Sequence, residues 1–214
     1  HMEHQDNMGN SGDLGPGSAQ WMKAASGIIH SEMPKQKNGL MRGFQLWINL
    51  PAAHKMDHPE YQEYPAEAFP VVKMQEYTVK VLIGRFADTN APITDELTGV
   101  SYYDVRVQSG KHFQHRLPAG NNSFLYVFEG DGQLGEQRVP LHSWVPLGAD
   151  EGSFDFVAGK KGARLLVVSG KPIGEPVARY GPFVMNTREQ IDQAMQDFQS
   201  NNFVRDRAWI KRNQ

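Results

Sequence analysis

Alternation of apolar and polar residues is the main pattern along this chain, and it predicts β-strands. In residues 43–50 (GFQLWINL) every second residue from Phe44 to Leu50 is apolar, which places these side chains on one face of a strand. Further strands are expected at residues 20–22, 27–33, 77–86, 102–107, 123–129, 153–157 and 163–169. Short strands separated by turns are typical of a β-sandwich or a small barrel.

The stretches between these strands are predicted to be turns or irregular surface. Residues 9–17 are rich in glycine, and they lack both the lysine and the strand-to-helix context of a phosphate-binding loop. Residues 51–70 contain four prolines and many charges, which favours an irregular surface segment. Residues 130–132 (GDG) are expected to turn the chain after the strand at 123–129.

One helix is predicted near the end of the chain. Thr187 and Gln190 have the spacing of a capping box, and the helix is expected to end at Asn201 and Asn202. A single apolar stripe follows the cap, formed by Ile191, Ala194, Met195 and Phe198. The tail after the helix carries Phe203, Trp209 and Ile210 between basic residues. We expect its apolar groups to pack on a sheet.

Composition narrows the classes of protein that this chain could be. The 21 glycines and 13 prolines among 214 residues exceed average usage and suit a turn-rich all-β fold. The formal net charge of -2 gives no basic surface for nucleic acid, and the absence of cysteine excludes disulfides and thiolate sites. No apolar run is long enough for a membrane helix and no leader opens the chain. The expected location is therefore the cytoplasm, or the nucleus in a eukaryote.

His30 and Glu32 are the best candidates for metal ligands. They are two residues apart in the predicted strand at 27–33, and such residues point to the same face. A neutral imidazole with a carboxylate suits Fe(II), Mn(II) or Zn(II). The alternative is that both side chains only form hydrogen bonds to the backbone.

The other histidines are weaker candidates. His4 and Asp6 repeat the spacing of two, but a solvated terminus is the favoured interpretation. His112 and His115 are three residues apart, so a strand would direct their rings to opposite faces. Surface or turn positions are expected for His54, His58 and His142.

Four segments together resemble the pirin family, whose members are bicupins. They are GIIHSEMP at 27–34, GFQLWINLPAAHKM at 43–56, SFLYVFEG at 123–130 and GPFVMNT at 181–187. The resemblance implies an all-β fold of two tandem cupin β-sandwich barrels, the first incomplete, with a C-terminal α-helix. The expected division is a partial N-terminal cupin at 1–70, a C-terminal cupin at 71–180, and the helix and tail at 181–214.

The resemblance also implies what the metal site would be. Pirins bind iron through three histidines and one glutamate, and two of these histidines belong to a His-Pro-His-Arg-Gly-Phe motif that this chain lacks. His30 and Glu32 match the other two ligands. The expected cofactor is Fe(II) or another divalent transition metal, held in a weakened or empty site because half of the ligands are missing.

The functional expectation follows from the same family. Some pirins are quercetin 2,3-dioxygenases, which open a flavonol ring with dioxygen, and here Glu32 would act as the base. The alternatives are a non-catalytic, metal- or redox-sensitive co-regulator that binds other proteins, and an inactive structural remnant. A flavonol-like small molecule is the expected ligand, with no nucleic acid or membrane as partner. A homodimer or strand exchange would cover the incomplete barrel.

Overall fold

The computed structural model describes residues 1–6, 9–35, 38–148, 152–206 and 210–212. Within these residues the chain is mostly β-strand, with α1 as the only α-helix, which confirms the predicted all-β class. The chain divides into two compact units. Unit 1 contains His1–Ala68 and Ile173–Gln214, and unit 2 contains Phe69–Pro172. The segment at 173–180, assigned above to the C-terminal cupin, therefore belongs to unit 1.

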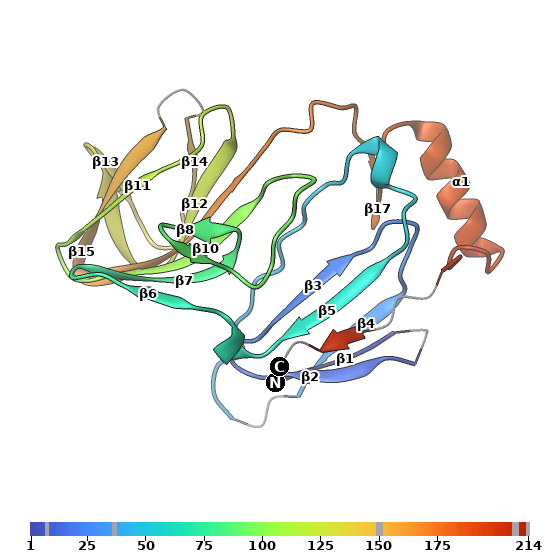
Figure 1. Cartoon of the computed structure of the whole chain (residues 1–214), viewed down its shortest axis with the longest axis horizontal. Coiled ribbons are helices and arrows are strands. Elements are labelled where there is room, and N and C mark those ends of the chain that lie inside the picture. Colours follow the sequence, from blue (N-terminus) through green and yellow to red (C-terminus); the bar gives the residue numbers. More distant parts are fainter. Residues whose placement is uncertain (7–8, 36–37, 149–151, 207–209, 213–214) are drawn as a thin grey trace. The chain divides into compact units, whose positions relative to one another are not determined.

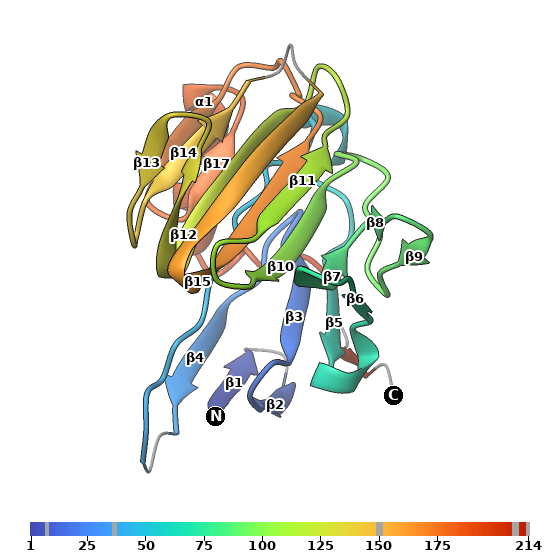
Figure 2. The same ribbon diagram turned by 90° about the vertical axis from the view of Figure 1, so that its left-hand side faces the viewer.

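Unit 2 is built on one large antiparallel sheet with the strand order β13-β12-β15-β10-β7-β6, to which β11 adds on β15 and β14 adds on β12. Figure 2 shows β12, β15 and β10 lying side by side. A short hairpin of β8 and β9 leaves the sheet. The strands are β6 (Val71–Lys73), β7 (Tyr77–Ile83), β8 (Arg85–Phe86), β9 (Thr89–Asn90), β10 (Ser101–Val107), β11 (His112–Arg116), β12 (Asn122–Leu134), β13 (Gln137–Val139), β14 (Trp144–Leu147) and β15 (Ser153–Gly170).

The core of unit 2 follows directly from the alternation in its sequence. Every second residue of β7 from Val79 to Ile83 is buried, as is every second residue of β10 from Tyr103 to Val107. These side chains pack with Phe113 of β11 and with the inward residues of β12 and β15. Burial of this apolar surface is the main force that stabilises the unit.

Two predictions for unit 2 are wrong in the same way, because strands continue where a break was expected. β12 runs through residues 130–132, and β15 joins the two strands predicted at 153–157 and 163–169. Gly130 has φ +69, and a Cβ there would lie 2.0 Å from the carbonyl oxygen of Gly162. The glycine therefore permits a bulge and a close approach between two strands rather than a chain reversal.

Unit 1 contains two three-stranded sheets, with the orders β2-β1-β4 and β18-β5-β3. In Figure 1, β3, β5 and β18 are neighbours, with β18 in red. A hairpin of β16 and β17 precedes α1. The elements are β1 (Met2–Asp6), β2 (Ser11–Leu14), β3 (Ala19–Lys23), β4 (His30–Pro34), the 3-10 helices η1 (Ala52–His54) and η2 (Ala66–Ala68), β5 (Glu60–Tyr64), β16 (Ala178–Tyr180), β17 (Phe183–Met185), α1 (Arg188–Gln199) and β18 (Ile210–Arg212).

Three predictions for unit 1 are wrong. Residues 43–50 form no ladder with any described residue, and Phe44 and Trp47 are 45% and 56% exposed. Alternation indicates an extended chain, but a strand also needs a hydrogen-bonded neighbour. Conversely, β2 lies in the glycine-rich stretch and β5 lies in the proline-rich stretch. Both are short and polar, so no hydrophobic alternation marks them.

The C-terminal helix is as predicted. The Thr187 hydroxyl accepts from the backbone N–H of Gln190, and the Gln190 side chain accepts from the backbone N–H of Thr187. Ile191 is buried, and the ring of Phe198 packs against those of Phe183 and Phe203. Trp209 lies outside the described residues. No described helix has the length and apolar character that a bilayer crossing requires.

Candidate metal centre

His30 and Glu32 lie close together at the start of β4. The distance from His30 Nδ1 to Glu32 Oε1 is 3.9 Å, and the side chains are 24% and 34% exposed. His30 Nδ1 is inaccessible to solvent, and no described residue forms a hydrogen bond to it. A buried nitrogen without a hydrogen-bond partner is costly, so it indicates a position where a further group would be accommodated.

The neighbouring strand β1 brings two more polar side chains to the same face. In the antiparallel β1–β4 pair, His4 is opposite Glu32 and Asp6 is opposite His30. Directly opposite residues point to the same side of a sheet, with Cβ atoms about 4.5–5.5 Å apart. Asp6 accepts hydrogen bonds from the backbone and side chain of Asn10, the first at 2.9 Å.

His4 is the most buried of these side chains, with 1% exposure, so the prediction of a solvated terminus is wrong. Its Nδ1 lies 3.0 Å from the hydroxyl of Tyr61, and its Nε2 contacts a carboxylate oxygen of Glu63. Tyr61 and Glu63 both belong to β5, so the contacts join the two sheets of unit 1. Both ring nitrogens of His4 are therefore occupied by protein groups.

Gly12 on β2 makes room for this contact. A Cβ at that position would lie 2.3 Å from His4 Nε2 and 2.6 Å from Glu63 Oε1. Any larger residue would displace one of the two partners. The glycine-rich stretch thus contributes to the packing of the site, as well as to turns.

Tyr61 lies in an acidic environment. Burial raises the pKa of its phenol, and the carboxylates of Glu63, Glu32 and Asp6 raise it further. The phenol is therefore protonated at neutral pH, and its hydroxyl lies within hydrogen-bond distance of His4 Nδ1. The same shift indicates that three carboxylates are close enough to Tyr61 to act on one hydroxyl.

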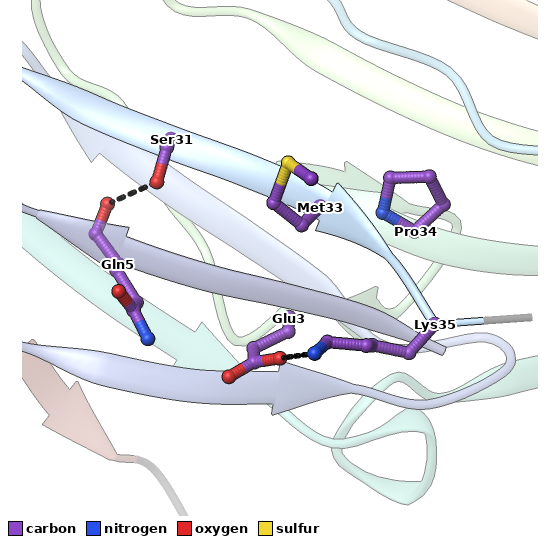
Figure 3. Close-up of a pocket in the computed structure, with 6 residues that line it drawn as sticks. All are labelled: Glu3, Gln5, Ser31, Met33, Pro34 and Lys35. Carbon is purple, nitrogen blue, oxygen red and sulfur yellow. Dashed lines mark hydrogen bonds and ion pairs between the residues drawn. The ribbon is translucent and has the colours of Figure 1, made fainter.

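The opposite face of the β1–β4 pair carries a cavity of about 250 Å³. Figure 3 shows the Ser31 hydroxyl directed at the Gln5 carbonyl oxygen, at 3.4 Å, and Lys35 paired with Glu3 at 2.5 Å. These residues alternate along their strands with His4, His30 and Glu32. The cavity is consequently separate from the candidate metal centre.

Three further histidines, His54, His58 and His142, each lie beside one acidic residue at most. His54 lies 2.9 Å from Asp57, His58 lies 3.4 Å from Asp206, and His142 is exposed with φ +65. These observations agree with the surface and turn positions expected for them.

The two histidines of β11 diverge as their spacing predicts. His112 is exposed and lies 3.0 Å from Asp155, whereas His115 packs among aromatic rings, with Phe86 and Phe113 stacked on it at 5.2 and 5.8 Å between centroids. Burial lowers the pKa of His115. Neither arrangement provides two imidazoles for one metal.

The donor set of the candidate centre fits a metal only in part. His30 and Glu32 supply one nitrogen and one oxygen, which suits Fe(II), Mn(II) or Zn(II). Within the part of the chain that the structure describes, no three His, Cys, Asp or Glu side chains form a group able to hold a metal ion. His30 and Glu32 are therefore a pair of potential donors and not a complete ligand set.

Tyr61 and Glu63 are the residues that sequence reasoning missed. They lie in the proline-rich segment and alternate with Gln62 and Tyr64, so both faces of β5 look polar or aromatic. The one available signal is the pair of tyrosines between Pro59 and Pro65. A strand with a polar inward face is hidden from any search for apolar periodicity.

Comparison with known families matches most of the chain. The sequence pattern described as the pirin C-terminal cupin domain matches residues 102–204, and the pattern described as pirin matches residues 1–48. The second match contains β1 and β4, with His4, His30 and Glu32.

Individual relatives agree with this result. A pirin-like protein of Caulobacter vibrioides is 44% identical over 204 residues, covering 94% of this chain and 73% of that protein. A Pseudomonas aeruginosa protein, named as a candidate quercetin 2,3-dioxygenase, is 43% identical over 204 residues, covering 92% and 71%. The crystal structure of a quercetin 2,3-dioxygenase from Acinetobacter baumannii matches with a TM-score of 0.84 at 26% identity, covering 94% of this chain and 72% of that one.

Proposed function

The chain belongs to the pirin family of cupin proteins, and from this premise we propose that it binds a divalent transition metal and acts as a quercetin 2,3-dioxygenase. The proposed ligands are His30 and Glu32. The proposed metal is Fe(II), and the proposed substrate is a flavonol. The similarity to the Acinetobacter dioxygenase and to the Pseudomonas protein supports this reaction class.

The observation that carries the proposal is the position of His30 Nδ1. This nitrogen is buried, has no hydrogen-bond partner among the described residues, and lies 3.9 Å from the Glu32 carboxylate. An imidazole nitrogen and a carboxylate oxygen are donors that Fe(II) accepts. A cation at this position would compensate both the unpaired nitrogen and the acidic surroundings of Tyr61.

The residues of the chain would have distinct roles. When bound, a divalent transition metal supplies a Lewis acid and a redox-active centre for chemistry with dioxygen. The Glu32 carboxylate would take the proton from the flavonol hydroxyl, and the His30 imidazole would help to fix the reacting group beside it. Because the described residues offer two donors, we expect metal affinity below that of a complete four-donor site.

A second candidate function is non-catalytic binding of a protein partner, with metal as a regulator. The observation in its favour is the same incomplete donor set, since no group of three potential ligands occurs among the described residues. Two donors leave a bound metal exchangeable, which suits a regulatory ion better than a catalytic one.

An activity assay separates the two functions. The protein is loaded with Fe(II) without oxygen and its iron content is measured. Quercetin is then added under air, and loss of the flavonol absorbance is followed. We expect turnover, and we expect Glu32→Gln to lower the rate per bound iron about 100-fold or more, which is typical for loss of a general base.

Ser31→Ala is the matched control for this assay. Ser31 lies between His30 and Glu32 on β4, but its hydroxyl is directed to the Gln5 carbonyl on the other face. We expect Ser31→Ala to keep the rate of the unsubstituted protein. No turnover by protein that holds iron would contradict the dioxygenase proposal and favour the non-catalytic function.

A further inference from the structure

We propose that His4, Tyr61 and Glu63 form a positioning network for the candidate metal centre, in which His4 fixes the direction of the Glu32 carboxylate without itself binding metal. This inference rests on the proposed function, which it deepens. It concerns residues on β1 and β5, whereas the proposed ligands lie on β4.

The first argument is the place of His4 beside Glu32. The two residues are directly opposite each other in the β1–β4 pair, so their side chains are neighbours on one face. His4 is 1% exposed and Glu32 is 34% exposed. We infer that the buried ring limits the space open to the Glu32 side chain, whose carboxylate lies 3.9 Å from His30 Nδ1.

The second argument is that the ring of His4 is held on both sides. A carboxylate oxygen of Glu63 can only accept, which assigns the proton of the neutral ring to Nε2. Nδ1 is then the acceptor for the Tyr61 hydroxyl, 3.0 Å away. Tyr61 also packs edge-to-face against the ring, with centroids 5.6 Å apart. A ring held by one hydrogen bond, a close carboxylate contact and an aromatic contact is restricted to one orientation.

The third argument is that the arrangement excludes His4 as a ligand. A metal-binding imidazole needs a nitrogen lone pair directed at the metal, and here Nδ1 accepts from Tyr61 while Nε2 faces Glu63. Gly12 closes the same region, since a Cβ there would meet both His4 and Glu63. Residues of this kind commonly tune a metal site through its ligands.

The test compares Tyr61→Phe and Glu63→Gln with a control, Tyr64→Phe, in the full chain. Tyr64 is on the same strand and is also buried. It lies three positions after Tyr61 and so on the other face of β5, and its hydroxyl donates to Gln62. Co²⁺ is titrated into each protein and followed by its visible absorption, which reports both affinity and coordination geometry. We expect about tenfold weaker Co²⁺ binding in the first two variants, a typical loss for residues behind metal ligands.

The control and the spectra separate positioning from general damage. Tyr64→Phe is expected to bind Co²⁺ within twofold of the unsubstituted protein. The Co²⁺ spectrum should change shape in Tyr61→Phe and Glu63→Gln, whereas a loss of folding alone would reduce its amplitude without changing its shape. Equal affinity and an unchanged spectrum in all three variants would overturn the inference.

NMR of the metal-free protein supplies an independent measurement. We expect the nitrogen signals of His4 to show the Nε2–H tautomer, which Tyr61→Phe should turn into a mixture. Tyr61→Phe should also shift the backbone amide signals of His30 and Glu32, and Tyr64→Phe should not. A failure of the unsubstituted chain to bind Co²⁺ would contradict the proposed function, whereas unchanged amide signals in Tyr61→Phe would overturn the positioning role itself.

Discussion

Replacement of Lys55 by methionine tests how unit 1 is held together. Lys55 is 5% exposed, and its ammonium group donates to Asn49 Oδ1 at 2.6 Å and to the carbonyl oxygen of Val184 at 3.1 Å. It therefore joins the segment around residues 49–55 to strand β17, which is far along the chain. Burial lowers the pKa of Lys55, and the nearby Glu175 carboxylate opposes this shift.

The magnitude follows from those two contacts. A hydrogen bond from a charged donor contributes about 1.5–3 kcal/mol, so two such bonds give about 3–6 kcal/mol. Lys55→Met loses these two hydrogen bonds. It also removes the cost of keeping a charged ammonium group out of water, which offsets part of the loss. Methionine retains most of the side-chain volume, so we expect a net loss of about 2–4 kcal/mol in the free energy of unfolding of unit 1.

The assay must report on unit 1 alone. Trp21 and Trp47 belong to unit 1, and Trp144 belongs to unit 2, so a Trp144→Phe background removes the tryptophan signal of unit 2. Urea unfolding is then followed by fluorescence. Lys35→Met is the control, since Lys35 is exposed and water screens its ion pair with Glu3. Equal losses in Lys55→Met and Lys35→Met would refute the reasoning.

Two further predictions concern unit 2. Burial lowers the pKa of His115 in the folded state, so the unfolded chain takes up the proton first as the pH falls. The free energy of unfolding should decrease below about pH 6.5. His115→Phe should reduce this decrease when urea unfolding is compared at pH 7.5 and pH 5.5. An identical pH dependence in the variant would show that His115 is not the group responsible. Gly130→Ala should cost more than about 2 kcal/mol, because its Cβ would meet the carbonyl oxygen of Gly162. Urea unfolding that differs by less than about 0.5 kcal/mol would show that the bulge relaxes freely.

The sequence predicts the parts of the fold where hydrophobic contrast is strong. β7 and β10 alternate between buried and outward residues, and the cap at Thr187 begins α1 as its spacing indicates. Residues 43–50 have an equally clear pattern but no ladder, because pairing depends on which strand lies beside them. Gly130 could also be interpreted in two ways from the sequence, because a glycine with φ above zero occurs in bulges as well as in turns.

At the candidate site, too, the sequence predicts local geometry but not contacts between distant segments. The spacing of His30 and Glu32 suffices to predict that they share a face, and they lie 3.9 Å apart. The burial of His4 could not be predicted, because it depends on contacts with β5, 57 residues away in the chain for Tyr61. Polar groups at such a distance are brought together by the fold as a whole, and no local pattern encodes them.

The most direct test of the proposed metal centre is a crystal of this chain soaked in Co²⁺ and measured at the cobalt absorption edge. We predict an anomalous peak between the His30 imidazole and the Glu32 carboxylate, and we predict that it is lost in His30→Gln. A strong peak only at other His–Asp pairs, such as His54 with Asp57 or His112 with Asp155, would contradict the account. So would the absence of any peak beside His30 in a crystal of the unsubstituted chain.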